Sequence, residues 1–188
     1  MNGLNTASRI IAKIGEVIYW IIAAAMIPCT IATATGKMNL GDAIEILSDG
    51  SAIDLAASGF SIETTAVSIS ATELMIFFIT LLITAVLMAM IFRNVYLIFK
   101  TAIGKTKRSI GPTPFQPETV RMTREIGYFA IAIPLIQLVI SIISGFAFGG
   151  TLEMSVDLGT VAFGIIVLCL SQFFTYGMQL QQEVDGLV

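Results

Sequence analysis

Long apolar runs alternate with shorter polar segments along the whole chain. Four runs are long enough to cross a bilayer, at residues 14–34, 74–99, 126–148 and 158–180. An α-helix rises 1.5 Å per residue, so about 20 residues span a hydrocarbon core roughly 30 Å thick. The pattern therefore predicts an all-α membrane protein, a bundle of four transmembrane helices that forms one domain over residues 1–188. A cleavable signal peptide is a less favoured alternative for the first run, because the apolar part of such a peptide normally spans only 7–15 residues.

Two of the polar segments carry local structural signals. In the loop 35–73, β-branched residues at 53–57 and 60–69 flank Ser58-Gly59 and predict a short hairpin, and residues 42–47 are compatible with a helical turn. In the connector 100–125, Gly104 predicts the end of one helix, and Pro117 followed by Glu118 predicts the start of the next.

Composition agrees with a membrane class. Hydrophobic residues make up 56% of the 188 residues and charged residues only 12%, whereas about 25% of a soluble domain is charged. The mean hydropathy is +0.90 and the net charge is −3. The charge excludes a broad basic face, so no direct contact with nucleic acid is expected.

The charges also predict an orientation, because Lys and Arg resist translocation more than acids do. The loops 35–73 and 149–157 together hold one base and eight acids, whereas the rest of the chain, including Arg93 and Glu16 near the ends of their runs, holds nine bases and five acids. Six of those nine bases lie in the connector: Lys100, Lys105, Lys107, Arg108, Arg121 and Arg124. The connector and both termini are therefore expected in the cytoplasm, with the acidic loops outside.

No catalytic or cofactor chemistry emerges from the residue pattern. The chain has no His, and its two cysteines, Cys29 and Cys169, fall inside apolar runs, where we interpret both as buried small residues. The acidic loop lacks the spacing of an EF-hand, so a solvated surface is favoured over a calcium site. We predict no metal site, no cofactor and no enzymatic activity.

A stripe of small and polar residues follows one face of the third apolar run. We interpret the stripe as a helix-packing surface, since small residues let membrane helices approach closely, and a substrate path along it is the alternative. Gly164 of the fourth run is assigned the same packing role. The candidate packing residues are Pro134, Gln137, Ser141, Gly145 and Gly164.

Two motifs resemble one known family. Residues 114–120 read Pro-Phe-Gln-Pro-Glu-Thr-Val and precede Arg121, Arg124, Ile126 and Gly127; the chain closes with Phe173-Phe174-Thr175-Tyr176-Gly177, then residues 180–185 and Val188. Both motifs, in this order around four spans, are similar to bacterial membrane proteins grouped as domain of unknown function 2975, although Thr119 stands where that family usually has Asn. The resemblance implies a bacterial inner-membrane location and a gene often found beside a small helix-turn-helix regulator.

These observations favour a non-enzymatic interaction or regulatory protein, a sensor or tether that docks a cytoplasmic partner. A small transporter or channel, or an accessory subunit of a transport complex, is the alternative. Membrane lipid is an expected partner, and the sequence leaves open whether the protein forms a homo-oligomer. The second and fourth runs end on the inner side and the third begins there, so the connector and tail are expected to meet. Arg121 and Arg124 also complement the acids of the tail, either as a docking surface or through an internal salt bridge. The candidate docking residues are Pro114, Phe115, Pro117, Glu118, Arg121, Arg124, Gln181, Glu183 and Asp185.

Overall fold

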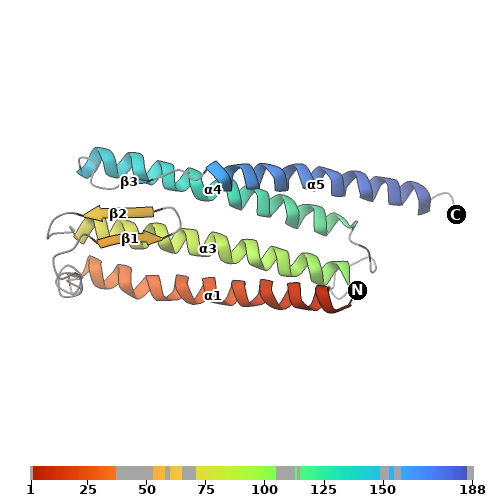
Figure 1. Ribbon diagram of the computed structural model, residues 1–188, viewed down its shortest axis with the longest axis horizontal. Coiled ribbons are helices and arrows are strands. Elements are labelled where there is room, and N and C mark those ends of the chain that lie inside the picture. The colour runs from red at the N-terminus through yellow and green to blue at the C-terminus, as the bar shows by residue number, and fades with distance from the viewer. Residues whose placement is uncertain are drawn as a thin grey trace. The chain divides into compact units, whose positions relative to one another are not determined.

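Four long helices make up most of the protein (Figure 1). The computed structural model describes residues 2–36, 53–57, 60–64, 71–104, 113, 115–148, 153–154 and 158–185. The helices are α1 (Asn2–Ala34), α3 (Ala71–Ala102), α4 (Pro117–Phe148) and α5 (Leu158–Asp185). Each contains a segment long and apolar enough to cross a membrane: Thr6–Ala34, Leu74–Ala102, Pro117–Phe146 and Leu158–Val184. The predicted all-α fold with four membrane-spanning helices is confirmed.

The helix boundaries follow the local sequence signals. α4 begins at Pro117, as predicted, with Glu118 in its first turn. Two helices end at a glycine: Gly104, after α3, has φ 74° and Gly36, after α1, has φ 66°. Positive φ is strained for residues with a Cβ, so glycine is the favoured residue at such a helix end. Their amides donate to carbonyls of the last turn, from Gly104 to Thr101 at 2.9 Å and from Gly36 to Thr33 at 3.1 Å.

A small antiparallel sheet accompanies the helices. Strands β1 (Ile53–Ala57) and β2 (Phe60–Thr64) pair as the predicted hairpin, with Ile53 opposite Thr64 and Ala57 opposite Phe60. Residues 65–69 of the predicted second strand and the predicted turn at 42–47 lie outside the described residues. A third strand, β3 (Glu153–Met154), pairs with the start of β2. We did not predict β3, because two residues carry no periodicity.

Backbone contacts divide the chain into two compact units. Unit 1 combines Met1–Tyr19, Leu87–Ala132 and Leu158–Val188, and unit 2 combines Trp20–Val86 with Ile133–Asp157. Unit 1 therefore contains all of α5 and about half of each other helix, whereas unit 2 contains the sheet. Within unit 1, α1 contacts α3 at Gly15 and Phe92, and α4 contacts α5 at Gly127 and Gly164.

Several buried hydroxyls are satisfied within their own helices, whereas Thr119 Oγ1 is buried without a hydrogen-bond partner. Thr80 donates to the carbonyl of Ile76 at 2.8 Å, Thr123 to Thr119 at 2.8 Å and Ser171 to Leu168 at 2.7 Å. This arrangement suits a hydrocarbon environment, where an unsatisfied polar group costs several kcal/mol, about 4–8 in the most apolar reference solvent. Large apolar side chains instead cover the outer surfaces of α1, α4 and α5, where Ile11, Ile143 and Ile166 are each more than half exposed.

Candidate partner-docking surface

The end of the connector contacts α5 through a hydrogen bond and an aromatic ring. Thr113 Oγ1 donates a hydrogen bond to Gln181 Oε1 at 3.0 Å. The ring of Phe115 lies over Gly177, where a Cβ would come within 2.5 Å of Cε1, and its centroid is 6.1 Å from that of Phe174. Phe174, Gly177 and Gln181 are three and four residues apart, so they share one face of α5. We call Thr113, Phe115, Phe174, Gly177 and Gln181 the clasp.

A buried glutamine fixes the turn that presents the clasp. Gln116 is 1% exposed, and its Nε2 donates to the carbonyl of Thr113 at 2.7 Å. Its own carbonyl accepts the amide of Val120 at 3.2 Å, which makes Gln116 the N-cap of α4. The Phe115 amide also donates to Thr113 Oγ1 at 3.2 Å. Sequence reasoning missed Thr113 and Gln116, although their position just before a helix-starting proline marks the place where caps occur.

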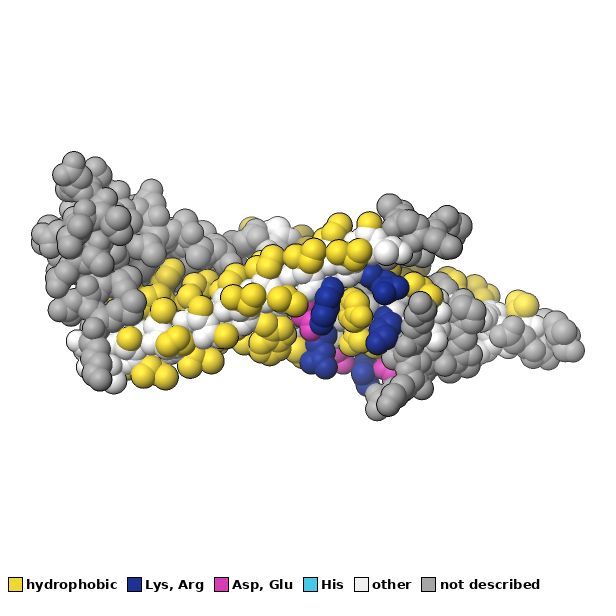
Figure 2. Space-filling view, turned by 90° about the horizontal axis from the view of Figure 1, so that it is seen from below, with side chains coloured by type: hydrophobic (Ala, Val, Ile, Leu, Met, Phe, Trp, Pro, Cys, Tyr) yellow, Lys and Arg dark blue, Asp and Glu magenta, His cyan; other side chains and the backbone are white. Residues whose placement is uncertain are grey.

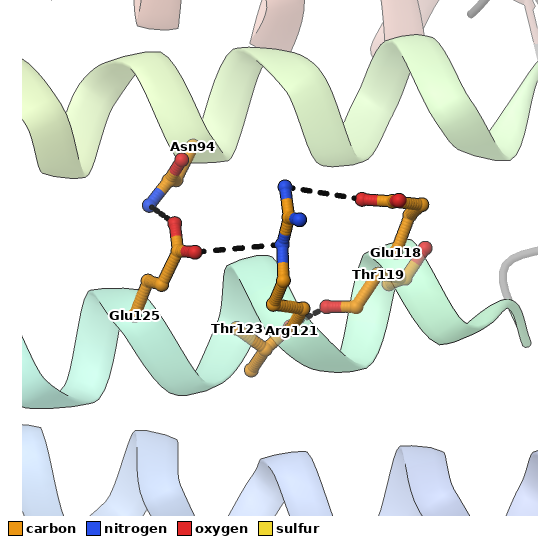
Figure 3. Close-up of polar contacts among 6 residues, drawn as sticks. All are labelled: Asn94, Glu118, Thr119, Arg121, Thr123 and Glu125. Atoms are coloured by element: carbon orange, nitrogen blue, oxygen red, sulfur yellow. Dashed lines mark hydrogen bonds and ion pairs between the residues drawn. The ribbon is translucent and has the colours of Figure 1, made fainter. Parts of the chain in front are cut away.

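A ladder of charged and polar groups runs along the first turns of α4 (Figure 3). Arg121 Nη2 lies 3.2 Å from Glu118 Oε2, and Arg121 Nε lies 3.5 Å from Glu125 Oε1. The second oxygen of Glu125 accepts a hydrogen bond from Asn94 Nδ2 of α3 at 3.0 Å. Asn94 is only 5% exposed, whereas the Arg121 side chain is 56% exposed. We call this series of contacts the ladder; it runs from the exposed Arg121 side chain to the buried Asn94 side chain between α3 and α4.

The predicted meeting of connector and tail is observed, but through different groups. Thr113 links Phe115 to Gln181 of the predicted set, because its Oγ1 accepts the Phe115 amide and donates to Gln181 Oε1. Arg121 pairs with Glu118 and Glu125 of its own helix. Its complementarity to the acids of the tail stays a prediction, since the side chain of Asp185 lies outside the described residues. Acids three residues before and four residues after an arginine lie beside it on a helix and reach it first.

The remaining predicted docking residues differ in how far the structure describes them. Pro117, Arg124 and Glu183 are exposed. Pro114 and the side chain of Asp185 lie outside the described residues.

The predicted packing stripe is mostly buried. Pro134 is less than 2% exposed, Gln137 3% and Ser144 1%, while Ser141 is half-buried. Gly145 is exposed and nothing lies within 4 Å of a Cβ at that position, so a packing role there is not supported.

Gly164 does pack closely, and its partner is a residue that we had not assigned. A Cβ at Gly164 would lie 3.1 Å from the carbonyl oxygen of Gly127 and 3.2 Å from the amide nitrogen of Ile131. A Cβ at Gly127 would likewise lie 3.1 Å from the carbonyl oxygen of Gly164. The two glycines therefore set a reciprocal close approach of α4 and α5 in unit 1.

The cysteines are placed differently from one another. Cys29 is half-buried, whereas Cys169 is exposed on α5, so the prediction of a buried Cys169 was wrong. Hydropathy cannot separate the two environments, because a lipid-facing position is as apolar as a core position. Among the residues that the structure describes, no group of three His, Cys, Asp or Glu side chains could hold a metal ion.

Comparison with family models finds no match to this chain, and comparisons with curated proteins and with solved structures likewise find none.

Proposed function

We propose that this is a bacterial inner-membrane protein, with both termini in the cytoplasm, that docks a cytoplasmic protein in a regulatory or tethering role without catalysing a reaction. A small helix-turn-helix regulator is the partner that the family resemblance suggests. The proposal is carried by Phe115, which is fixed by the clasp and yet 39% exposed. An aromatic side chain that is already ordered and still accessible is the kind of anchor that dominates protein interfaces.

The surroundings of Phe115 extend this anchor into a surface. Tyr176, Leu180 and Val184 are 64%, 62% and 61% exposed and recur every four residues, so they form one apolar stripe along the end of α5. Exposed Arg124 and Glu183 add charges of both signs. Apolar anchors beside mixed charges are typical of a protein contact, in which the anchors supply affinity and the charges supply orientation.

Preorganisation also favours docking here. The turn from Thr113 to Phe115 is held by the Gln116 side chain at 2.7 Å and by the Thr113–Gln181 hydrogen bond at 3.0 Å. A partner that binds this turn therefore loses less entropy than one that must order a free loop.

The test is recovery of a soluble partner with the full-length protein purified from native membranes. Phe115→Ala and Arg124→Glu should each lower the amount of partner recovered. Phe163→Ala serves as the matched aromatic control, because Phe163 is 52% exposed on α5 and lies more than three turns before Tyr176. Thermal unfolding of each variant separates loss of docking from loss of fold. We expect Arg124→Glu to leave the melting temperature unchanged, since surface substitutions typically change stability by less than about 0.5 kcal/mol.

Two results would contradict the proposal. One is the absence of any stoichiometric soluble partner on the unmodified protein. The other is equal recovery with Phe115→Ala, Arg124→Glu and Phe163→Ala. Solute flux in vesicles that contain only the purified protein would favour the transporter alternative instead.

A further inference from the structure

Basic side chains of unit 1 gather on α1 and α3 as well as on α4. Figure 2 shows Lys and Arg side chains close together on one face, with acidic side chains among them and hydrophobic ones beside them. Four of the bases belong to α1 and α3: Arg9, Lys13, Arg93 and Lys100. Lys13 and Arg93 are exposed, and Arg9 and Lys100 are half-buried. We call these four residues the basic quartet.

Side-chain contacts fix the relative direction of α1 and α3 at this face. Lys13 Nζ lies 5.3 Å from the centroid of the Tyr96 ring. Further along α1, a Cβ at Gly15 would lie 2.7 Å from Cδ1 of Phe92, and the Tyr19 ring stacks on Phe92 at 5.5 Å. Residue numbers therefore rise along α1 as they fall along α3, so the two helices are antiparallel here.

This direction brings the basic quartet together around one contact. Arg9 lies one turn before Lys13, and Lys100 lies one turn after Tyr96, so the antiparallel pairing puts Arg9 and Lys100 at the same level. Arg93 is one turn before Tyr96 and seven residues from Lys100, which puts both on one side of α3. The quartet thus brackets the Lys13–Tyr96 contact from both helices.

Most of this positive charge has no acidic partner. Glu16 Oε2 lies 2.9 Å from Lys13 Nζ. Within the described ranges, no acid forms an ion pair with Arg9, Arg93 or Lys100. The Nε of Arg9 is in addition buried without a hydrogen-bond partner. Three uncompensated cations and an unsatisfied donor on one face favour a bound anion with several acceptor oxygens.

The position of the quartet along the spans indicates which molecule supplies the bound anion. The quartet lies on the end segments of two candidate spans, Thr6–Ala34 and Leu74–Ala102. Exposed apolar side chains adjoin it on α1, where Ile10 is 53%, Ile14 53% and Val17 45% exposed. Lipid phosphates lie where the apolar surface of a span ends, and basic clusters between helices bind anionic headgroups there. We propose that the basic quartet binds the phosphate of an anionic phospholipid, whose acyl chains lie along the exposed face of α1.

Lipid binding can be measured on the purified full-length protein in detergent, by native mass spectrometry and by thermal unfolding, independently of any protein partner. Phosphatidylglycerol should remain bound and raise the melting temperature, whereas zwitterionic phosphatidylcholine should do so much less. Arg93→Gln should weaken phosphatidylglycerol binding about fivefold, and Arg93→Gln with Lys100→Gln roughly thirtyfold, since each cation near an anionic lipid surface contributes about 1 kcal/mol and tenfold corresponds to 1.4 kcal/mol.

Arg93→Lys is the matched control, because it keeps the positive charge at the same position and should leave most of the lipid binding intact. Equal affinity for the two lipids, or equal loss with Arg93→Gln and Arg93→Lys, would overturn the proposal. Inorganic phosphate tests for a soluble anion instead: the same rise in melting temperature with phosphate alone would also overturn it. If the double variant does not fold, the single variants Arg93→Gln and Lys100→Gln decide the outcome.

Discussion

Two glycines determine how closely α4 and α5 approach within unit 1. At Gly127 and Gly164, each backbone carbonyl would lie 3.1 Å from a Cβ on the opposite residue. Backbone atoms cannot rotate away as a flexible side chain can, so these positions tolerate no added volume without a helix shift. Gly177 differs, because the atoms nearest to it belong to the exposed ring of Phe115. The same residue type therefore has a structural role at one position of α5 and a surface role at another.

We expect Gly164→Leu to destabilise the protein by about 1–3 kcal/mol, the usual cost of overpacking a close contact. The control is Gly145→Leu, because nothing lies within 4 Å of a Cβ there. Leu forms helix better than Gly by roughly 0.5–1 kcal/mol, so the control should be neutral or slightly stabilising. Thermal unfolding in detergent compares the two, and equal melting temperatures would show that α4 and α5 do not meet at these glycines.

At the scale of elements, α4 is tied to its neighbours by two different devices. The ladder connects it to α3 through the 3.0 Å hydrogen bond between Asn94 and Glu125. The clasp connects the residues just before α4 to α5 through Thr113 and Phe115. Both sets of contacts lie at the start of α4, beside the proposed docking surface. A partner bound to that surface would therefore contact a helix end that is held from two sides.

The buried end of the ladder should contribute more stability than its exposed end. Asn94→Ala would leave the buried-side oxygen of Glu125 without its donor, at an expected cost of about 1.5–3 kcal/mol for a hydrogen bond to a charged group. Arg121→Ala removes ion pairs on a side chain that is 56% exposed and should cost only about 0–1 kcal/mol. Chemical unfolding of both variants in detergent tests the order, and a larger loss with Arg121→Ala would refute it.

At the scale of the whole molecule, local signals predicted the fold well. The four spans, the start of α4 at Pro117, the glycine that ends α3 and the β1–β2 hairpin all follow from runs and turn residues a few positions long. The errors concern pairings between distant residues. Gly164 packs against Gly127, which had not been assigned, and nothing lies within 4 Å of a Cβ at Gly145. Cys169 is exposed, because core and lipid-facing positions have the same hydropathy.

The candidate site was predicted only in outline for the same reason. The cytoplasmic ends of consecutive spans were expected to meet, and Phe115 does reach α5. Which side chains make the contact depends on their geometry, and residue spacing in the sequence does not predict that geometry. Thr113 forms a hydrogen bond with Gln181, while Arg121 forms an ion pair within its own helix. Arg121 pairs within α4 because its acidic partners are one turn away, so the ion pairs cost little side-chain conformational entropy.

Orientation in the membrane is the remaining property of the whole molecule, and charge predicts it. Nine of the ten bases lie in the segments expected inside, so the end of α1 should face outside and the end of α5 should face the cytoplasm. Thr35→Cys and Glu183→Cys report these ends, since both residues are exposed, in a background where Cys29 and Cys169 are replaced by Ala. A membrane-impermeant maleimide should label Thr35→Cys in cells with a permeable outer barrier, and Glu183→Cys only after the inner membrane is opened. The reverse pattern would mean that the basic connector lies outside, where a cytoplasmic partner could not reach the clasp.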